Sequence, residues 1–299
     1  MGFQQHATHT DDDSLAPTRM NTRTKLQIAR ALYWTLTGFR RVGGRNDSAR
    51  VTRRGIQWQL DLREGIDLAI YAFGYFEYET VRAYRRMLKP GDTVIDIGAN
   101  IGAHTLHLAR CVSPTGKVIA FEPTAYAYNK LRQNIALNPM LASLIEAEQI
   151  MLVDSDATQV KAQLYSSWQI HDTAAGTHPK HGGRLMDTTG AHNVSLDSYV
   201  TRHKIDAISL IKMDVDGHEC QVLHGAHELL QRDKPVLLME LMPYGLEEVG
   251  ASLDELLELL SAHGYSLYNL DGKTALPADN SIRQRVPRAG GINIICIAK

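Results

Sequence analysis

The segment that most constrains this chain is DTVIDIGANIGAHT, at positions 92–105. Its residues 93–97 form a short β-branched and apolar run, which is typical of a strand buried on both faces of a parallel sheet. Gly98 and Gly102 then punctuate a turn, where the missing Cβ lets a ligand approach the backbone. Residues 103–112 place apolar side chains on one side of a predicted helix. Together these elements predict a nucleotide-type pocket, because free amide groups and the helix dipole point at the turn.

The polar residues of this segment narrow the choice of ligand. A dinucleotide-binding turn has the spacing GxGxxG, and its second glycine lets a pyrophosphate reach the backbone. Asn100 occupies that place here, and Asp96 stands near the end of the strand. A carboxylate there would repel a diphosphate but suits an ammonium or sulfonium group. The segment therefore favours S-adenosylmethionine, although an ordinary turn between a buried strand and helix explains it equally well in isolation.

Composition and charge limit the class of protein. The chain carries 32 basic and 33 acidic residues, so its overall charge implies neither a nucleic acid nor an anionic membrane as partner. Its three cysteines are far apart and odd in number, which argues against a disulfide framework and a CxxC zinc site. No apolar run approaches the roughly 18 residues of a membrane span, and no signal peptide is visible. We therefore expect a globular protein of the cytoplasm.

The residues before the glycine turn predict a tail and an extension. Residues 1–22 contain few large apolar side chains, and we expect them to be disordered. Residues 24–39 have the spacing of an amphipathic helix in a basic stretch, and its apolar face would cover the core, pair with a second subunit or touch a membrane. Residues 51–62 and 67–73 indicate two strands of a hairpin. A helix over 76–88 completes an extension spanning 23–90, which leaves 91–299 as the catalytic domain.

The residues after the glycine turn continue an alternation of strands and helices. A strand over 117–121 ends at Glu122 and Pro123, and a carboxylate at this place can accept hydrogen bonds from a ribose. A helix over 124–137 and a strand over 143–152 follow, and Asp154 just beyond them could contact an adenine. Residues 157–193 predict a lid or substrate loop with one strand. Three histidines in this loop do not have the spacing of a zinc site; they are His171, His178 and His181.

A second polar cluster, DVDGHE at 214–219, follows a predicted strand over 207–213 and precedes a predicted single helix that ends at Leu230. The next strand, 235–241, carries Glu240 near its end. Open α/β sheets bind ligands at the carboxyl ends of such strands. Two further strands, 265–270 and 292–297, have no full helix between them and predict an antiparallel hairpin. The fold class is therefore α/β, with a mostly parallel sheet of seven strands, an antiparallel C-terminal hairpin and an N-terminal extension of helix and β-hairpin.

At this point the chain resembles the FkbM-type S-adenosylmethionine-dependent methyltransferases, over about residues 55–298. The resemblance rests on GYFEYET at 74–80, LKPGDTVIDIGANIG at 88–102, FEP at 121–123, SLDSYV at 195–200 and IKMDVDGHECQVLHGA at 211–226. It implies a Rossmann-like class I methyltransferase fold and O-methylation of a sugar, glycolipid or polyketide hydroxyl. Family members usually have Glu where Asp216 stands. The donor-binding set that we expect is Glu77, Asp96, Gly98, Ala99, Asn100, Gly102, Glu122, Pro123, Asp154 and Asp214.

A hydroxyl acceptor must lose its proton during methyl transfer, and a positioned base contributes about 10² to 10⁴ fold to the rate. The candidates are Asp214, His218, Glu219 and Glu240, and histidine has a pKa suited to this work near neutral pH. In an alternative arrangement, Asp214, Asp216 and Glu240 would hold a magnesium ion that acidifies the hydroxyl. We expect no metal. The expected partner is a small-molecule, glycan or lipid-linked hydroxyl acceptor, with a homodimer or a peripheral membrane contact left open.

Two other classes of function share this pattern. A nicotinamide-dependent oxidoreductase uses the same strand and helix units, but it requires the GxGxxG spacing that Asn100 interrupts. A non-catalytic nucleotide-binding scaffold would keep the fold and lose the charged cluster or the donor-binding turn. Both of these motifs are intact in this sequence.

Overall fold

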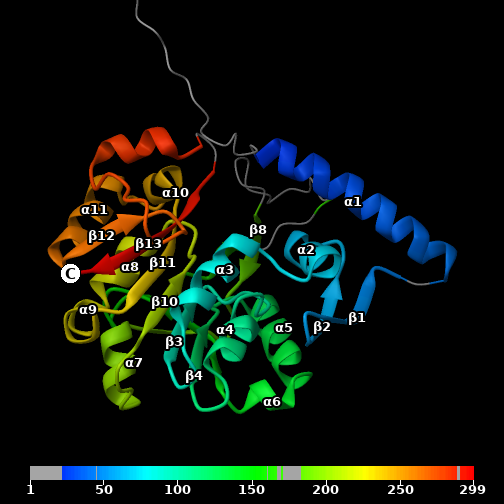
Figure 1. Cartoon of the computed structure of the whole chain (residues 1–299), viewed down its shortest axis with the longest axis horizontal. Helices are drawn as coiled ribbons and strands as arrows, with labels where there is room; N and C mark the ends of the chain where they lie inside the picture. The colour runs from blue at the N-terminus through cyan, green and yellow to red at the C-terminus, as the bar shows by residue number, and fades with distance from the viewer. Residues whose placement is uncertain (1–21, 45, 160, 167–169, 171–182, 288–289) are drawn as a thin grey trace, which may run out of the picture.

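The computed structural model describes residues 22–44, 46–159, 161–166, 170, 183–287 and 290–299. Its central feature is a seven-stranded sheet in which six strands run in one direction and one, the sixth in spatial order, runs antiparallel to both of its neighbours. In spatial order the strands are β5 (Ile145–Glu148), β4 (Lys117–Phe121), β3 (Thr93–Ile97), β10 (Leu210–Met213), β11 (Val236–Leu241), β13 (Ile292–Ala298) and β12 (Tyr265–Tyr268). The predicted sheet and its antiparallel C-terminal strands are confirmed (Figure 1).

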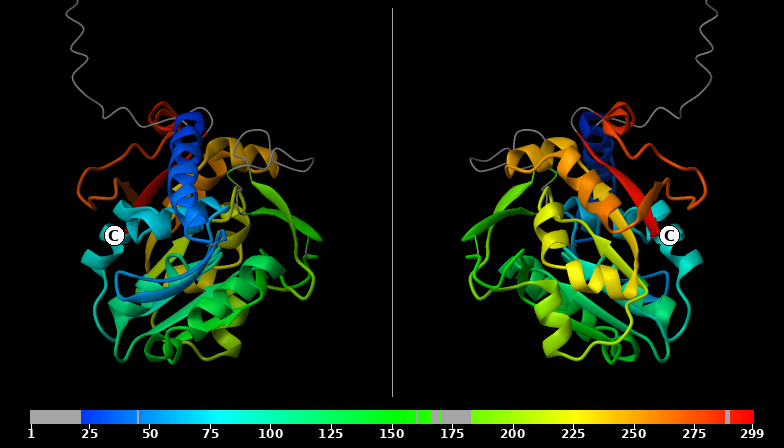
Figure 2. Two further views of the ribbon diagram at one scale, coloured as in Figure 1. Left: turned by 90° about the vertical axis from the view of Figure 1, so that its right-hand side faces the viewer. Right: turned by 90° about the vertical axis from the view of Figure 1, so that its left-hand side faces the viewer.

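Helices cover both faces of this sheet, and the alternation of side chains along each strand shows which helix packs on which face. In β3, Ile95 belongs to the core beneath α7 to α11, whereas Val94 belongs to the core beneath α3 and α4. Figures 1 and 2 show the resulting three layers. The helices are α3 (Tyr78–Met87), α4 (Thr105–Val112), α5 (Ala125–Ala136), α7 (Leu196–Arg202), α8 (Glu219–His224), α9 (His227–Asp233), α10 (Pro243–Glu248) and α11 (Leu253–Ala262).

The N-terminal extension corrects one prediction. It consists of α1 (Thr22–Val42), β1 (Ser48–Arg53), β2 (Ile56–Asp61) and α2 (Gly65–Phe73), and α3 completes it. The hairpin turns at Arg54 and Gly55, both with positive φ, inside the segment expected to be a single strand. The second expected strand, 67–73, is the helix α2. An apolar run of this length does not distinguish a strand from a buried helix, and here Leu68 and Ile70 are buried in helical geometry.

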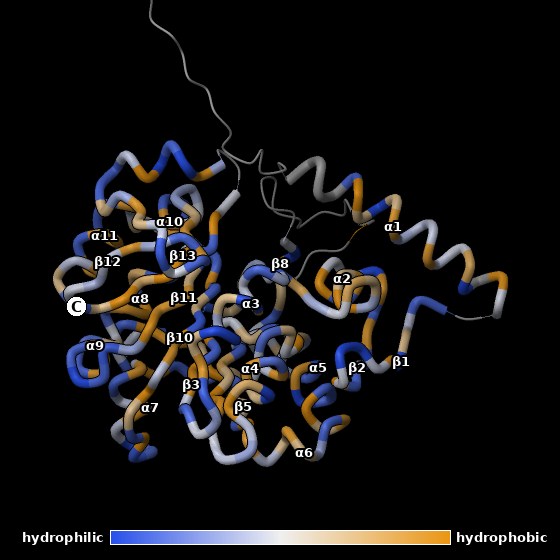
Figure 3. Tube along the Cα trace, in the orientation of Figure 1, coloured by the Kyte–Doolittle hydropathy of each residue, from blue (hydrophilic) through white to orange (hydrophobic). Residues whose placement is uncertain are grey.

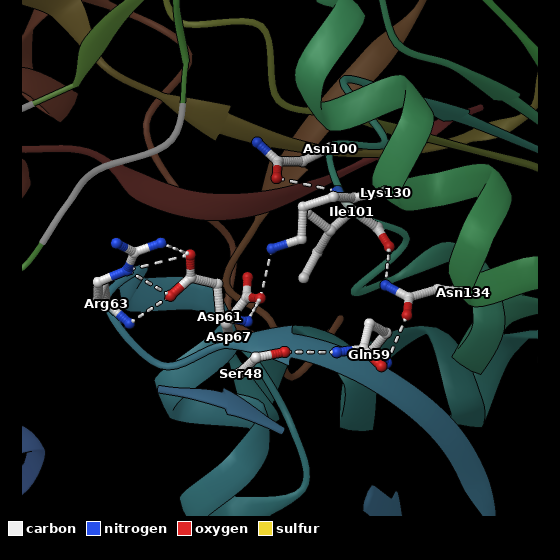
Figure 4. A network of polar contacts seen from close by, with 9 residues as sticks. All are labelled: Ser48, Gln59, Asp61, Arg63, Asp67, Asn100, Ile101, Lys130 and Asn134. Atoms are coloured by element: carbon white, nitrogen blue, oxygen red, sulfur yellow. Dashed lines mark hydrogen bonds and ion pairs between the residues drawn. The ribbon is translucent and has the colours of Figure 1, made fainter. Parts of the chain in front are cut away.

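Polar side chains join this extension to the sheet domain (Figure 4). The Gln59 amide N–H of β2 donates to Asn134 Oδ1 at 2.8 Å, and Asn134 Nδ2 donates to the Ile101 carbonyl at 3.0 Å. Nearby, Lys130 Nζ lies 2.5 Å from Asp67 Oδ1 in an ion pair whose acid is almost fully buried. Asn134 thus ties β2 directly to the helix side of the glycine turn, so the extension supports the site-bearing loop.

Short elements beyond the main sheet correct two further predictions. The expected strand over 143–152 is divided into β5 and β6 (Ile150–Leu152), and β6 pairs with β9 (His192–Val194) outside the main sheet. The single helix expected after DVDGHE is divided into α8 and α9. The remaining elements are α6 (Pro139–Ala142), β7 (Gln163–Ser166), β8 (Arg184–Asp187) and the 3₁₀ helix η1 (Asn280–Arg285).

Two predictions lie outside the described residues, namely nearly all of the disordered tail over 1–22 and the three histidines His171, His178 and His181. The division of the chain at residues 22 and 90 stays a prediction. Among the helices that the structure describes, none combines the length and the apolar character needed to cross a bilayer.

Candidate active site

A cavity of about 790 Å³ opens at the carboxyl ends of β3, β4, β10 and β11, where an open α/β sheet binds its ligand. The sheet brings most of the predicted site residues to its wall, although they come from segments more than 100 positions apart. Those that line the cavity are Glu77, Gly98, Ala99, Asn100, Glu122, Pro123, Asp214, His218 and Glu240. Their roles stay predictions, but their placement at one edge agrees with the sequence analysis.

Asp96 and Gly102 are not among the residues that line the cavity, and their expected contact with the donor stays a prediction. The Asp96 side chain is fully buried on the α4 face of β3, where its Oδ2 accepts a 2.6 Å hydrogen bond from Thr105 Oγ1. Because side chains alternate between the two faces of a sheet, Asp96 lies on the same face as Val94, two residues before it. At Gly102 the backbone has φ +89°, and a Cβ would meet Leu131 Cδ1 at 2.9 Å. Both residues support the turn from below.

Asp154 and Glu219 also lie away from the cavity wall. Asp154 is exposed in a surface turn and accepts a hydrogen bond from Thr158 Oγ1 at 2.7 Å. The chain leaves the main sheet after β5, and the residues of β6 that line this part of the cavity are Ile150, Met151 and Leu152 rather than Asp154. Glu219 is buried at the start of α8, and burial raises the pKa of its carboxyl to about 7. Its assignment as a candidate base stays a prediction, although it does not line the cavity.

The glycine turn is built by a close approach between two strand ends. Gly98 has φ +75°, and an added Cβ would lie 1.9 Å from the Asp214 carbonyl oxygen. The amides of Gly98 and Ala99 both donate to the Phe121 carbonyl at the end of β4, at 3.0 and 2.9 Å. Asn100, with φ +47°, follows in left-handed geometry. The absent side chain at Gly98 therefore lets the ends of β3, β4 and β10 converge on one point.

Glu122 is held at the end of β4 by main-chain donors. Its Oε2 accepts from the Asn100 amide at 2.9 Å, and its Oε1 accepts from the Thr124 amide at 2.9 Å and from Thr124 Oγ1 at 2.5 Å. The residue is only 3% exposed, and burial raises the pKa of its carboxyl despite these donors. A carboxylate has about four acceptor sites, so Oε2 keeps capacity for a ligand hydroxyl.

A second group of residues closes the floor of the cavity between β10 and α3. Lys212 is buried on β10, and its Nζ lies 3.7 Å from Asp96 Oδ1 and 3.5 Å from Asp214 Oδ2. Burial works against the charge of Lys212, but these carboxylates outweigh it and raise the pKa of the lysine. Glu77, which has φ +48°, accepts a 2.9 Å hydrogen bond from Asn293 Nδ2, and its Oε2 lies 3.6 Å from His104 Nε2.

Three carboxylates gather beside Lys212 at the ends of β10 and β11. Asp214, Asp216 and Glu240 each place an oxygen within 4.8 Å of the others, as the magnesium alternative requires. Burial, followed by repulsion from Asp214, raises the pKa of Asp216 to about 8 and that of Glu240 well above its ordinary range. Carboxylates arranged in this way favour a cationic ligand, because a nearby positive charge would offset their repulsion and stabilise the charged form that burial disfavours.

His218 is oriented at the cavity wall by two contacts. Its Nδ1 lies 3.0 Å from the Val215 carbonyl, which can only accept, so Nδ1 carries the proton. Its Nε2 is 2.8 Å from Lys161 Nζ and accepts from that ammonium group. Burial and the nearby Lys161 charge lower the pKa of the imidazole. At neutral pH the side chain is therefore a neutral base with its lone pair on Nε2.

Sequence reasoning missed Lys212, His104, Asn293 and Lys161. A signal existed for Lys212, because a charged residue inside the otherwise apolar strand over 207–213 needs a buried partner. The other three belong to a helix start, the C-terminal strand and the polar loop, and nothing in the local pattern of those segments points to a ligand.

A model of the methyltransferase FkbM domain matches residues 96–267, which is more than half of the chain. The chain belongs to the FkbM methyltransferase family. The predicted family and the predicted enzyme class, a methyltransferase, are thereby confirmed. The match begins at Asp96 and spans the DVDGHE cluster, so it contains the glycine turn, Glu122 and all four candidate bases.

Similar proteins from other organisms cover different shares of the chain. The 31-O-demethyl-FK506 methyltransferase FkbM of Streptomyces tacrolimicus is 28% identical over 225 residues, which are 65% of this chain and 82% of that protein. The hexuronic acid methyltransferase AglP of Haloferax volcanii is 26% identical over 161 residues, 52% of this chain and 58% of that protein. Among solved structures, methyltransferase FkbM from Methylobacillus flagellatus aligns at a TM-score of 0.41 and 17% identity, over 77% of this chain and 59% of that chain.

Proposed function

We propose that the protein transfers a methyl group from S-adenosylmethionine to a hydroxyl of a sugar, glycolipid or other natural-product acceptor. The observation that carries this proposal is one cavity with two kinds of carboxylate. Glu122 suits a ribose, and the cluster of Asp214, Asp216 and Glu240 suits a cation. When bound, S-adenosylmethionine supplies a methyl group on a positively charged sulfur, which makes the carbon open to attack by an oxygen nucleophile.

The residues of the chain fit this donor at both ends. Oε2 of Glu122 would accept from a ribose hydroxyl, while the main-chain donors of Asn100 and Thr124 hold the carboxylate in place. At the other end, Asp214 and Glu240 would face the positive charges, and Lys212 Nζ lies 3.5 Å from Asp214 Oδ2 in an ion pair. Gly98 lets the Asp214 main chain approach the turn, so the ends of β3 and β10 lie close enough for one donor to span them.

We assign the general base to His218 among the four candidates. Its Nδ1 proton is fixed by the Val215 carbonyl, so the basic Nε2 faces the cavity wall at which Lys161 stands. An acceptor hydroxyl would displace the exposed Lys161 ammonium group and donate its proton to Nε2. Asp214 is already paired with Lys212, and burial, followed by repulsion from Asp214, raises the pKa of Glu240 well above its ordinary range, so we prefer His218 to either acid.

The acceptor class that we propose is supported by the names of two relatives and not by the shape of the cavity. One relative is named for O-methylation of a demethylated FK506 and another for methylation of hexuronic acid. Both names describe oxygen-rich acceptors, and a hydroxyl acceptor is what an uncharged His218 could deprotonate. Location in the cytoplasm and assembly as a homodimer stay predictions.

Calorimetric titration tests the donor assignment. The protein should bind S-adenosylmethionine and S-adenosylhomocysteine but not NAD or NADP, and Glu122→Gln should weaken binding by about tenfold, since a charge-assisted hydrogen bond becomes a neutral one. Asp154→Asn is the matched control, because this acid also follows a strand but lies outside the cavity. Binding of a nicotinamide nucleotide alone would refute the proposal. Donor binding without turnover on any hydroxyl acceptor would instead support a scaffold.

A further inference from the structure

The outward face of α1 is uncharged and carries large apolar side chains. Its inward face buries Tyr33 and Thr37 against the hairpin and α2. On the other side, Ile28, Phe39 and Val42 are 49%, 79% and 92% exposed. These three positions differ by 11 and 14 residues, which are whole numbers of helical turns to within a fraction of a residue, so they share one face. Figure 1 shows α1 at the edge of the molecule, and Figure 3 shows hydrophobic residues recurring along it.

The charge of α1 indicates what kind of surface this face meets. The helix contains five basic residues and no acidic one, and the basic residues are Arg23, Lys25, Arg30, Arg40 and Arg41. Arg30 and Arg40 donate to main-chain carbonyls on the inward side, which carry no net charge, so α1 keeps a positive charge behind its apolar face. Two copies of the helix packed face to face would bring these like charges near one another with no acid on α1 to pair them. An anionic lipid surface would instead attract them over a distance of about 10 Å and would receive the apolar face below the headgroups.

We propose that α1 docks the protein on an anionic lipid bilayer through its outward apolar face. The helix would lie in the plane of the interface with its outward apolar side chains among the acyl chains, while Arg30 and Arg40 keep their inward hydrogen bonds and attract the anionic headgroups from a longer distance. This arrangement needs no change in the fold, because the inward face keeps Tyr33 in the core while the outward face is already exposed.

The docked helix is coupled to the rim of the cavity. Tyr33 of α1 belongs to the same apolar cluster that Ile66 packs against, and Ile66 lines the cavity. Arg30 Nε also donates at 3.0 Å to the carbonyl of Ile170, whose amide donates to Arg63 ahead of α2. Docking by α1 would therefore hold the rim next to the bilayer. This consequence rests on the proposed function, and it specifies the acceptor as a hydroxyl carried by a lipid.

Vesicle flotation with the full-length protein tests the proposal. The probes are vesicles of phosphatidylcholine alone and vesicles in which about a third of the lipid is phosphatidylglycerol. The wild-type protein should float with the anionic vesicles and lose this binding at high salt, because the charge attraction is screened. Phe39→Asp and Ile28→Asp should each weaken binding by at least about tenfold, since each places a carboxylate in the apolar face. Met140→Asp is the matched control, because Met140 is 88% exposed on α6, away from α1.

Each outcome bears on the inference. Absence of wild-type binding to anionic vesicles would overturn it, and so would equal loss of binding in all three variants or in none. A dimer in sedimentation velocity that Phe39→Asp dissociates, without vesicle binding, would assign the face to a second copy instead. Circular dichroism and titration with S-adenosylhomocysteine report on folding and on the donor site independently. A variant that still binds this ligand but no longer floats separates docking from the proposed function.

Discussion

Replacing Gly98 with alanine tests the central claim about the site, that a missing side chain lets the strand ends converge. Gly98 has φ +75°, and its added Cβ would lie 1.9 Å from the carbonyl oxygen of Asp214. That oxygen is main chain at the end of β10, so it cannot turn aside as a flexible side chain would. The two strand ends would have to separate by more than about 1 Å to restore an ordinary contact distance.

The expected cost has two parts. A non-glycine residue in left-handed geometry loses about 1–2 kcal/mol, and forcing an extra methyl group into a packed interior costs about 1–3 kcal/mol more. Gly98→Ala should therefore lower the free energy of unfolding by about 2–5 kcal/mol. Gly264→Ala is the matched control, since Gly264 has φ +76° and nothing lies within 4 Å of an added Cβ. It should lose only about 1–2 kcal/mol.

Chemical denaturation measures both variants, and calorimetry with S-adenosylhomocysteine measures the site. Because a misplacement of about 1 Å in a binding constellation can cost about 10² fold, Gly98→Ala should lose most of its affinity for this ligand. Gly264→Ala should keep it. Equal stability losses in the two variants, together with unchanged affinity at Gly98→Ala, would refute the reasoning about strand convergence.

Three further predictions concern the chemistry of the cavity. Burial and Lys161 lower the pKa of His218 from its usual value of 6.5, so the acidic limb of the kcat/KM profile should lie below pH 6.5. His218→Gln should remove this limb and lower kcat by about 10² to 10⁴ fold. A variant with the kcat of the wild type would rule out His218 as the base. Because Asp214 is already paired with Lys212, exhaustive chelation should leave turnover unchanged; loss of activity restored by magnesium would assign Asp214, Asp216 and Glu240 to a metal. Calorimetry in buffers of different ionisation enthalpy measures the protons released when a ligand binds. More protons should be released with S-adenosylmethionine than with S-adenosylhomocysteine, whose sulfur is uncharged, because a cation lowers the pKa of Asp216 from about 8. Equal proton release with the two ligands would contradict this placement of the positive charge.

The sheet could be predicted closely from the sequence, and the reason is visible in β3 and β4. Both predicted spans, 93–97 and 117–121, coincide with the observed strands, because turn residues bound short runs buried on both faces. The prediction of a strand over 67–73 was wrong because the local pattern of this segment is ambiguous. Its apolar residues suit a strand or a short helix, and what decides between them is non-local: Asp67 pairs with Lys130 of α5. That partner lies 63 positions away and cannot be read from the local pattern.

The candidate site could be predicted to the level of strand ends but not of single side chains. Carboxyl ends of parallel strands meet at one edge of the sheet, so the sequence predicts that Glu122, Asp214 and Glu240 lie close together. Alternation within a strand then decides which acids reach the cavity, and it turns Asp96 beneath α4 instead. Asp154 lies away from the cavity because the chain leaves the main sheet after β5, and β6 pairs with β9 instead. No residue pattern in the sequence marks this change of sheet.

The acidic cluster shows how stability and function oppose each other in this fold. The pKa of Asp216 is about 8 in the folded protein and ordinarily 3.8, so the folded state binds this proton more tightly than the unfolded chain does. By linkage, this carboxyl therefore costs the folded protein stability as the pH rises between those two values. Glu240 acts in the same direction, and Lys212 already pairs with Asp214 and Asp96. Uncharged side chains would relieve the repulsion but would give up the attraction for a positive ligand. A cluster that costs stability and sits at the ligand-binding edge of the sheet is best explained by a ligand whose positive charge restores the balance when it binds.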